Sequence, residues 1–298
     1  MQPVDVVVVS YNSSDTLREC VEPLCDVEGT TVVVVDNASP DGSLATIADL
    51  PVDAVALETN LGFGHGCNVG WRRGHSPAVL FLNPDARMDG ASLGRLVDVL
   101  AEDARAGVVG PRIADERGSL DYSIRRFPRL SSTYAQAFFL HRLAPRAAWV
   151  DEVVRDEARY EVPGEVEWIS GACMLVRRSL LETLGGFDEG FFLYCEDKDL
   201  CRRAWSEGST VRYEPGAQAL HVGGVSAPRG DLLPVLAASR IRYARKHSPG
   251  WTPAAERLGV ALGGLTHAAL GRGDKVVRRG HARAAVEALR WPLAGRSG

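Results

Sequence analysis

The sequence predicts an α/β fold: a doubly wound, mainly parallel sheet flanked by helices, with a helical C-terminal tail. Short apolar runs such as VDVVVVS (residues 4–10) and TVVVVD (residues 31–36) alternate with segments of helical spacing. Continuous apolar runs of this kind are typical of strands buried on both faces, as in a parallel sheet. With 298 residues, 45% of them hydrophobic and 24% charged, the chain is long enough for one large domain and a small extension.

The first half of the chain contains four predicted strands, each followed by a turn and a segment of helical spacing. Strands that alternate with helices in this way favour parallel pairing. The helix after the fourth strand is amphipathic, because Leu93, Leu96 and Leu100 fall on one face. The predicted strands are residues 4–10, 31–36, 52–58 and 78–83, and the predicted helices are residues 15–24, 44–50, 66–74 and 91–107.

The second half is less regular. The segment from Asp115 to Glu167 is rich in arginine, proline and aromatic residues, and we interpret it as a mobile loop plus a helix. Two closing strands are expected near the end, and their exposed edges favour a homodimer. The predicted elements are a strand at 168–177, a helix that ends at 185–186, a helix at 196–206, strands at 210–215 and 217–224, and helices from 232 interrupted at 249, 253 and 271–273.

Cysteine spacing and charge indicate the compartment and a surface. None of the six cysteines forms a CxxC pair, and the first residues lack the basic region of a signal peptide, so we expect free thiols in a cytosolic protein. Residues 229–298 carry 13 lysines and arginines against 4 acidic residues, although the whole chain has a net charge of −4. A basic tail on an acidic body indicates an anionic surface such as phospholipid, or alternatively a solvated helical face. Nucleic acid is disfavoured because no aromatic residues are interleaved with the basic ones.

Polar side chains follow the ends of the predicted parallel strands, at the edge where ligands bind in such sheets. Asp36 is interpreted either as the start of a turn or as a group that recognises a base or ribose. Asp85 follows a proline and either ends a turn or binds a divalent cation, which prefers one or two protein carboxylates plus phosphate oxygens. The residues at these strand ends are Ser10, Tyr11, Asn12, Asp36, Asn37, Asn60, Asn83, Pro84 and Asp85.

A glycine-rich turn, NLGFGHGCNVG (residues 60–70), leads into a predicted helix. Its backbone amides could approach a diphosphate at the helix N-terminus. The spacing of Gly64, Gly66 and Gly70 also occurs in dinucleotide-binding turns, so an NADP-dependent oxidoreductase is an alternative. That alternative is weak, because such turns usually follow the first strand and this one follows the third.

Acidic residues open the helix predicted at 196–206. Glu196, Asp197 and Asp199 either offset the helix dipole or supply a general base towards a hydroxyl. His221 follows a predicted strand, where an isolated histidine is often structural. Together with Asp85 it would make a suitable mixed site for Mn²⁺ or Mg²⁺.

In this order, the segments resemble an inverting family 2 glycosyltransferase with the GT-A fold, in its rhamnosyltransferase-like subgroup. The resemblance implies transfer of one sugar, L-rhamnose from dTDP-β-L-rhamnose, to a hydroxyl of a glycan or a polyprenyl-diphosphate-linked acceptor in cell-envelope polysaccharide synthesis. The basic tail fits such a lipid-linked acceptor, so we expect a cytoplasmic protein whose residues 240–247 and 275–291 rest on anionic lipid at the inner face of the membrane. The matching segments are VVVVSYN, VVVVDNASPDGS, NLGFGHGCNVG, LFLNPDA, GACMLVRR, GGFDEGFFLYCEDKDLCRRAW and HVGG.

The resemblance implies a role for each candidate residue. Asp197, beside Glu196, would be the catalytic base, and Asp85 with His221 would hold the metal. Asn83 stands where the family's DXD motif has its first carboxylate, so metal dependence is open, and the QxxRW motif of processive synthases is absent. Nucleotide binding is implied for Ser10, Tyr11, Asn12, Asp36, Asn37, Asn60, Gly62, Gly64, Asn83 and Asp85.

The expected organisation is a transferase domain at residues 1–228 and a basic helical extension at residues 229–298. Within the first, we expect a donor half over about 1–112 and an acceptor half over about 113–228. The sequence leaves open the same fold with a UDP-sugar or GDP-sugar donor. A non-catalytic binding module is a further alternative, but the presence of both Asp85 and Asp197 argues against it.

Overall fold

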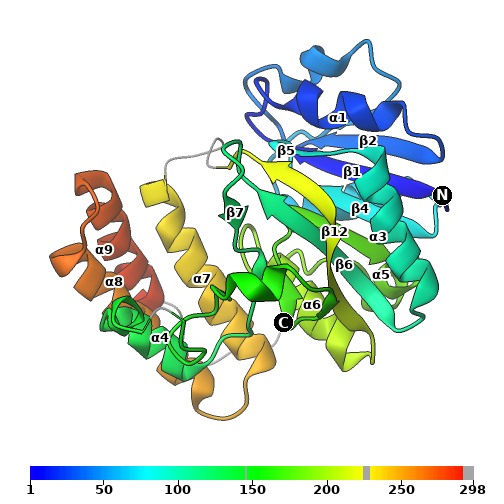
Figure 1. The fold of residues 1–298 in the computed structure, drawn as a ribbon. Helices are drawn as coiled ribbons and strands as arrows, with labels where there is room; N and C mark the ends of the chain where they lie inside the picture. The colour runs from blue at the N-terminus through cyan, green and yellow to red at the C-terminus, as the bar shows by residue number, and fades with distance from the viewer. Residues whose placement is uncertain (145, 224–228, 291–298) are drawn as a thin grey trace. The chain divides into compact units, whose positions relative to one another are not determined.

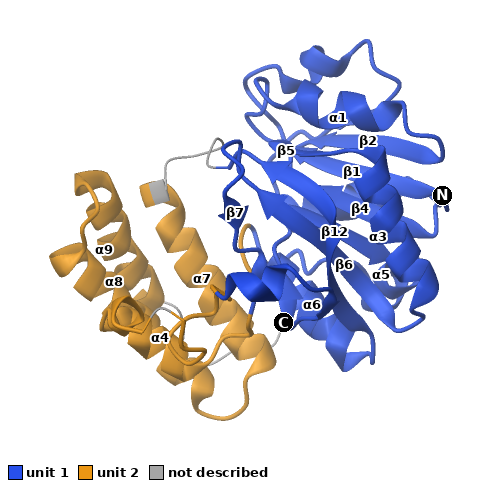
Figure 2. Cartoon of the chain, in the orientation of Figure 1, with its two compact units in different colours: residues 1–125, 156–192, 196–226 blue, residues 126–155, 193–195, 227–298 orange. Residues whose placement is uncertain are grey.

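The computed structural model describes residues 1–144, 146–223 and 229–290 (Figure 1). The predicted boundary at 228/229, the last residue of the second closing strand (Gly224) and Trp291 lie outside these ranges. The chain divides into two compact units (Figure 2). Unit 1 comprises residues 1–125, 156–192 and 196–226, and unit 2 comprises residues 126–155, 193–195 and 227–298.

The first half of the unit 1 sheet is parallel, as predicted. Its strands are β1 (Val4–Ser10), β2 (Thr30–Asp36), β3 (Asp53–Ala56) and β4 (Ala78–Leu82), in the order β3-β2-β1-β4. Each is a short, mostly β-branched or apolar run, and β1 and β4 are buried along their whole length. The register pairs Ser10 with Asp36, so these two residues end neighbouring strands side by side.

The second half of the sheet is mixed. Strand β11 (Cys173–Arg177) runs antiparallel to β4 and to β6 (Ala106–Ala114), and β12 (Thr210–His221) runs parallel to β6. Short β5 (Ala86–Met88) pairs with the end of β12. The sequence interpretation missed β6, because Gly107, Gly110 and Pro111 interrupt its apolar run.

Three predicted strands required correction. The strand expected at 168–177 is split into β10 (Trp168–Ile169), which pairs with β8 (Ile124–Arg125), and β11. The two closing strands are one continuous strand, β12, with a register shift between Glu214 and Gln218. Because β6 lies on one side of β12 and β5 and β9 (Gly164–Glu165) pair on the other, the expectation of exposed closing strands is wrong.

Helices cover both faces of this sheet, in agreement with a doubly wound fold. Helices α1 (Leu17–Cys25) and α3 (Gly90–Glu102) share one apolar core with alternate residues of β1, β2 and β4. Helix α2 (Phe63–Trp71) packs on the opposite side chains of β1, and α5 (Arg178–Leu184) and α6 (Glu196–Ser206) complete the unit. A 3₁₀ turn, η1 (Ser43–Ile47), replaces the helix predicted at 44–50. All six cysteines are free thiols.

Unit 2 is helical. The tail predicted as helices forms α7 (Arg229–His247), α8 (Thr252–Leu270) and α9 (Lys275–Arg290), which pack with α4 (Leu130–Ala137) and the short η2 (Leu140–Arg142). The loop-plus-helix segment expected at 115–167 is therefore divided, since β7 (Leu120–Asp121), β8, η3 (Glu157–Tyr160) and β9 belong to unit 1. No helix among the described residues is long and apolar enough to cross a membrane. The predicted donor and acceptor halves stay a prediction.

Candidate functional site

The ends of β1 and β2 present two buried polar atoms that lack partners. Ser10 is fully buried and Asp36 is 6% exposed. Neither Ser10 Oγ nor Asp36 Oδ1 has a hydrogen-bond partner within the part of the chain that the structure describes. Buried polar atoms are normally paired, so two orphans in register at the carboxyl edge of a parallel sheet point to a bound polar group.

The turns after these strands are tied together. Ser39 donates its backbone N–H to Asp36 Oδ2 at 2.9 Å, and its hydroxyl accepts the N–H of Asn12 at 3.1 Å. Asn12 and Ala38 adopt left-handed φ values of 54° and 61°, which are uncommon for residues other than glycine and often occur at functional sites. Tyr11 remains partly exposed beside them.

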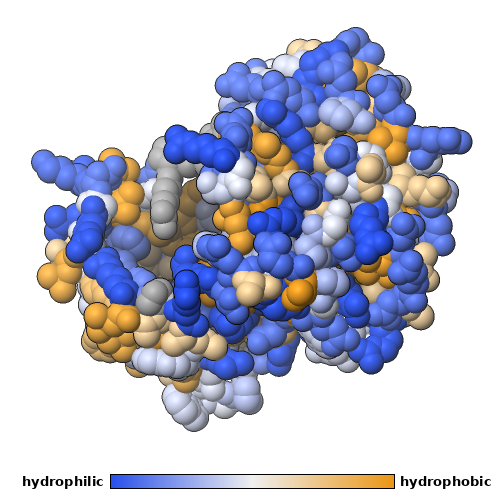
Figure 3. Space-filling view, in the orientation of Figure 1, coloured by the Kyte–Doolittle hydropathy of each residue, from blue (hydrophilic) through white to orange (hydrophobic). Residues whose placement is uncertain are grey.

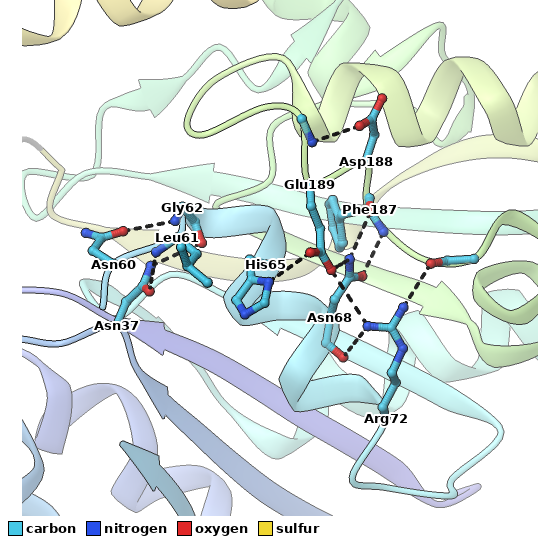
Figure 4. A network of polar contacts seen from close by, with 12 residues as sticks. Asn37, Asn60, Leu61, Gly62, His65, Asn68, Arg72, Phe187, Asp188 and Glu189 are labelled. Atoms are coloured by element: carbon cyan, nitrogen blue, oxygen red, sulfur yellow. Dashed lines mark hydrogen bonds and ion pairs between the residues drawn. The ribbon is translucent and has the colours of Figure 1, made fainter. Parts of the chain in front are cut away.

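Asn37 serves the neighbouring glycine turn (Figure 4). Its side-chain amide donates to the carbonyl of Gly62 at 3.1 Å and accepts from the N–H of Leu61 at 3.2 Å, while Asn60 accepts from the N–H of Gly62 at 3.0 Å. Gly62 has φ 98°, and a Cβ there would lie 2.3 Å from the carbonyl oxygen of Phe192. The turn is therefore held from both sides in a shape that only glycine allows.

The remaining glycines of this segment serve packing. A Cβ at Gly66 or Gly70 would lie within 3 Å of Val9 or Val7 of β1, so these glycines let α2 lie directly on the strand. Gly64 is also close-packed, 3.2 Å from Phe187 Cβ by the same construction. The spacing that suggested a dinucleotide turn is thus explained by helix–strand contact.

A second network in Figure 4 was not found from the sequence. The Asn68 amide donates to the Phe187 carbonyl and to Glu189 and accepts the Phe187 N–H, and His65 Nδ1 lies 2.8 Å from Glu189. These contacts fix α2 against the segment that leads to α6. No local sequence pattern predicts these contacts, because the partners lie more than 100 residues apart.

Asp85, His221 and Asp121 form a polar cluster at the end of β4. The β12–β5 ladder pairs His221 with Ala86, which brings His221 Nε2 to 3.3 Å from Asp85 Oδ1. Nδ1 of the same ring lies 3.5 Å from Asp121 Oδ2, and the Asn83 amide nitrogen lies 3.4 Å from Nε2. Burial by itself lowers the pKa of His221, but the bonds to Asp121 and Asp85 outweigh it and raise the pKa to about 9.

Asp121 is a site residue that the sequence interpretation missed. It lies on β7, the return strand of a hairpin whose first strand, β6, was also missed. Its bond to His221 lowers the pKa of Asp121 despite partial burial. A carboxylate on one ring nitrogen leaves the other nitrogen aimed at a metal in many metalloproteins.

Asp197 is presented at the same edge of the sheet. Its carboxylate accepts the N–H of Gly171 at 2.9 Å and of Lys198 at 2.7 Å, and it remains partly exposed. Ala172, the residue after Gly171, accepts the backbone N–H of Asn83 at 2.9 Å through its carbonyl. The segment that binds the Asp197 carboxylate is therefore also hydrogen-bonded to the end of β4. A fixed, accessible carboxylate of this kind can accept a proton from a hydroxyl.

Glu196 differs from its neighbour. It is 6% exposed, and its Oε2 has no hydrogen-bond partner among the described residues. Burial, followed by the adjacent charge of Asp197, raises the pKa of Glu196 to about 8. With this raised pKa, Glu196 keeps its proton at neutral pH.

The donor set at the β4 end fits a hard divalent cation. Asp85 would supply a carboxylate oxygen and His221 an imidazole nitrogen, with release of the proton that its raised pKa keeps on the ring in the absence of metal. A cation held by two protein ligands completes its shell with water and phosphate oxygens. The described residues contain no cluster of three or more acidic, histidine or cysteine side chains suited to a metal. A cation here therefore depends on oxygen ligands supplied by its substrate.

Comparison with known proteins gives consistent matches. Residues 5–185 match the model of the family described as Glycosyl transferase family 2. The chain is 32% identical over 264 residues to an N-acetylglucosaminyl-diphospho-decaprenol L-rhamnosyltransferase of Mycobacterium tuberculosis, covering 83% of this chain and 85% of that protein. It is 30% identical over 232 residues to the rhamnosyltransferase WbbL of Escherichia coli, covering 73% and 83%.

Solved structures share the fold at low identity. A mannosyltransferase from Pyrobaculum calidifontis, solved with GDP-Man and Mn²⁺, superposes with a TM-score of 0.58 at 18% identity over 97% of this chain and 87% of that one. TarS of S. aureus, residues 1–349 with UDP, gives a TM-score of 0.55 at 15% identity over 96% and 89%. These likenesses support the fold.

Proposed function

The chain belongs to glycosyl transferase family 2, and on that premise we propose that it transfers one L-rhamnose from dTDP-β-L-rhamnose to a hydroxyl of a lipid-linked glycan, with inversion. The observation that carries this proposal is the partly exposed Asp197 carboxylate, bonded to the segment that holds the end of β4. The two rhamnosyltransferase relatives support the choice of sugar, and the M. tuberculosis relative supports a polyprenyl-diphosphate acceptor.

The nucleoside is bound at the ends of β1 and β2. Asp36 Oδ1 accepts the N3–H of a thymine, and Ser10 Oγ lies at the neighbouring strand end with its own capacity for a hydrogen bond. Tyr11, Asn12 and the turn at Asn60–Gly64 line the rest of the nucleotide. A UDP-sugar is the second candidate donor, because uracil offers the same N3–H, and GDP is the third.

Asp85 and His221 hold Mn²⁺ or Mg²⁺ together with the donor diphosphate. The ion, when bound, neutralises the charge that develops on the departing nucleoside diphosphate. Asn83 stands where a second carboxylate would be expected, and its side-chain amide carries no charge. Because the site then has only one carboxylate, we expect metal affinity to be weak unless the nucleotide is bound. The Asp85→Ala variant is expected to weaken dTDP and Mn²⁺ binding together by at least about tenfold, measured by calorimetry.

Asp197 acts as the base. It takes the proton of the acceptor hydroxyl as that oxygen attacks the anomeric carbon from the face opposite the diphosphate. One C–O bond forms, the bond to the diphosphate breaks, and the bonding electrons leave with the diphosphate. A β-linked donor therefore gives an α-linked product, with no covalent enzyme intermediate.

Two further proposals concern contact of this chain with a membrane and with a second copy of itself. The basic tail was interpreted as resting on anionic lipid at the inner face through residues 240–247 and 275–291. Arg240, however, is partly buried in unit 2 and its guanidinium is paired with Glu256 and Glu152, so this charge is committed within the unit and not to lipid. Within these two segments, exposed basic residues lie on both helices: Arg245 and Lys246 on α7, and Lys275, Arg278, Arg279, Arg283 and Arg290 on α9. Trp291 falls outside the described residues. The homodimer stays a prediction for sedimentation measurements.

The test is a calorimetry panel of dTDP, UDP, GDP and NADPH, each with and without Mn²⁺. We expect Mn²⁺-dependent binding of dTDP, with UDP weaker and NADPH silent. Metal-dependent binding of another nucleoside diphosphate would change the donor but keep the reaction. Absence of binding by every nucleoside diphosphate would refute the proposed function.

A further inference from the structure

Unit 2 exposes an unusual number of large apolar side chains. Of the 14 large hydrophobic residues found exposed among the described residues, ten belong to unit 2. Figure 3 shows hydrophobic side chains gathered among hydrophilic ones on the part of this unit that holds α8 and α9. Exposed apolar groups that gather in one place usually mark an interaction surface.

The exposed side of α8 is apolar along its length. Trp251, Leu258 and Leu265 are spaced by seven residues, two helical turns, and are 73%, 55% and 54% exposed. Ala254 and Ala269 are exposed on the same side, and Leu270 ends the helix at 71%. A helix that faces water normally carries charged residues on its outer face. The two charged residues of α8, Glu256 and Arg257, are buried and partly buried instead.

The opposite side of α8 packs against the other helices of unit 2. Glu256 accepts from Thr133 at 2.6 Å and lies 2.9 Å from Arg240. A Cβ at Gly259 or Gly264 would lie within 3 Å of Thr133 or Ala285, so these glycines bring α8 close to its neighbours. The helix cannot turn its apolar stripe inward without breaking this packing.

A second exposed apolar group lies next to the C-terminal half of α8. Thr266 donates to the carbonyl of Ala137 at 2.7 Å, and the rings of Phe139 and His267 lie 4.4 Å apart. These contacts tie the segment after α4 to α8. Phe138 and Leu143, in that segment, are 57% and 83% exposed.

Basic side chains surround this end of α8. Arg278 donates to the carbonyls of Ala268 and Ala269 at 2.7 and 3.0 Å, which holds the start of α9 against the end of α8. The segment after α4 and the segment from the end of α8 into the start of α9 carry several exposed basic residues and one exposed acidic residue, Asp274. The basic residues include Arg142, which lies over the Phe139 ring, and Arg272, Lys275, Arg278 and Arg279.

We propose that unit 2 docks on an anionic lipid bilayer through this α8 surface, with the leucines and Trp251 entering the interface and the basic residues meeting the lipid headgroups. An apolar helix face with a basic border is the pattern of interfacial helices. A second copy of the chain is a poorer occupant, because a twofold contact would bring the two basic borders together. The proposal rests on the proposed function only for its purpose, delivery of the enzyme to a lipid-linked acceptor.

The test uses the full chain and vesicles without any substrate. Co-sedimentation is measured with vesicles that contain phosphatidylglycerol and with vesicles of phosphatidylcholine alone. The Leu258→Ser/Leu265→Ser variant is expected to lower partitioning by roughly tenfold or more. Val162→Ser, at a residue 50% exposed in unit 1, is the matched control and should bind like the wild type.

The basic border is tested separately. Lys275→Gln/Arg279→Gln should weaken binding to phosphatidylglycerol vesicles by about fivefold for each charge, while Arg117→Gln in unit 1 should have no effect. Brominated lipid should quench the tryptophan fluorescence of the wild type, and less so that of Trp251→Phe. Thermal unfolding checks that every variant is folded.

Three outcomes would overturn the proposal. They are equal partitioning of Leu258→Ser/Leu265→Ser and the wild type, equal binding to charged and neutral vesicles, and a wild-type dimer without lipid that dissociates in the double-serine variant. The last outcome would assign the surface to a second copy. Failure of every nucleoside diphosphate to bind, with vesicle binding intact, would refute the proposed function alone.

Discussion

The carboxyl edge of the unit 1 sheet and the α8 surface of unit 2 depart from ordinary protein packing in opposite ways. The first buries polar atoms that find no partner among the described residues, namely Ser10 Oγ, Asp36 Oδ1 and Glu196 Oε2. The second exposes apolar side chains, led by Trp251 and Leu265, that nothing described covers. Each costs the isolated protein stability, and each indicates the chemistry of a missing partner: a polar ligand in one unit, an apolar phase in the other.

The largest effect that separates the two regions is expected from Asp197→Asn. An amide cannot take the hydroxyl proton, so transfer should fall by about a hundredfold to ten-thousandfold, while dTDP binding and vesicle binding stay unchanged. Glu182→Gln, on the exposed side of α5, is the matched control. Turnover by Asp197→Asn close to that of the wild type would remove this residue from its role as base.

Gly62→Ala tests how rigidly the nucleotide edge is held. The new Cβ combines a φ of 98° with a collision against the Phe192 carbonyl, so we expect a loss of about 3 kcal/mol in unfolding free energy and weaker dTDP binding. Gly42→Ala has φ 74° and nothing within 4 Å of the new atom, so it carries backbone strain alone, about 1 kcal/mol. Equal losses in chemical denaturation would show that the Phe192 contact is unimportant.

Asp121→Asn tests whether a positioning residue supports the metal corner. The amide should orient His221 less firmly and lower Mn²⁺ affinity in the presence of dTDP by about tenfold to a hundredfold. Electron paramagnetic resonance of free Mn²⁺ measures this without turnover. Asp115→Asn, in the turn of the same hairpin, is the comparison variant, and an equal loss there would point to hairpin unfolding instead.

The smallest effect is expected from Glu196→Gln and depends on pH. The folded pKa of about 8 exceeds the ordinary value of 4.5, so between these values the unfolded chain releases a proton that the folded protein keeps. Stability of the wild type therefore falls as pH rises through this window. The glutamine variant has no such loss, so its melting temperature should gain a few degrees relative to the wild type from about pH 5 to about pH 8. A constant difference would mean that Glu196 is ionised throughout.

The sequence determined the elements whose pattern is local. Strands β1, β2 and β4 each contain a continuous run of apolar residues, and α6 begins at its acidic first turn and spans the range predicted for it. Most candidate residues lay at strand ends, and since parallel strands end at a common edge, their gathering around β1, β2 and β4 followed from the fold class. These inferences needed only the periodicity of side chains and the rule for parallel sheets.

Tertiary structure decided whatever depends on distant partners. The partnership of Asp121 with His221 requires the β6–β7 hairpin and the register of β12, and neither leaves a local signal in a segment broken by glycine and proline. Only the fold shows that the Asn37 side chain bonds to the turn at Leu61 and Gly62, and its predicted contact with the nucleotide stays a prediction. The sequence of α8 is apolar on nearly every side, so only packing against α4 and α9 determines which side is covered and which remains exposed. A sequence lists the side chains a helix can bury, but the neighbours that cover them come from elsewhere in the chain.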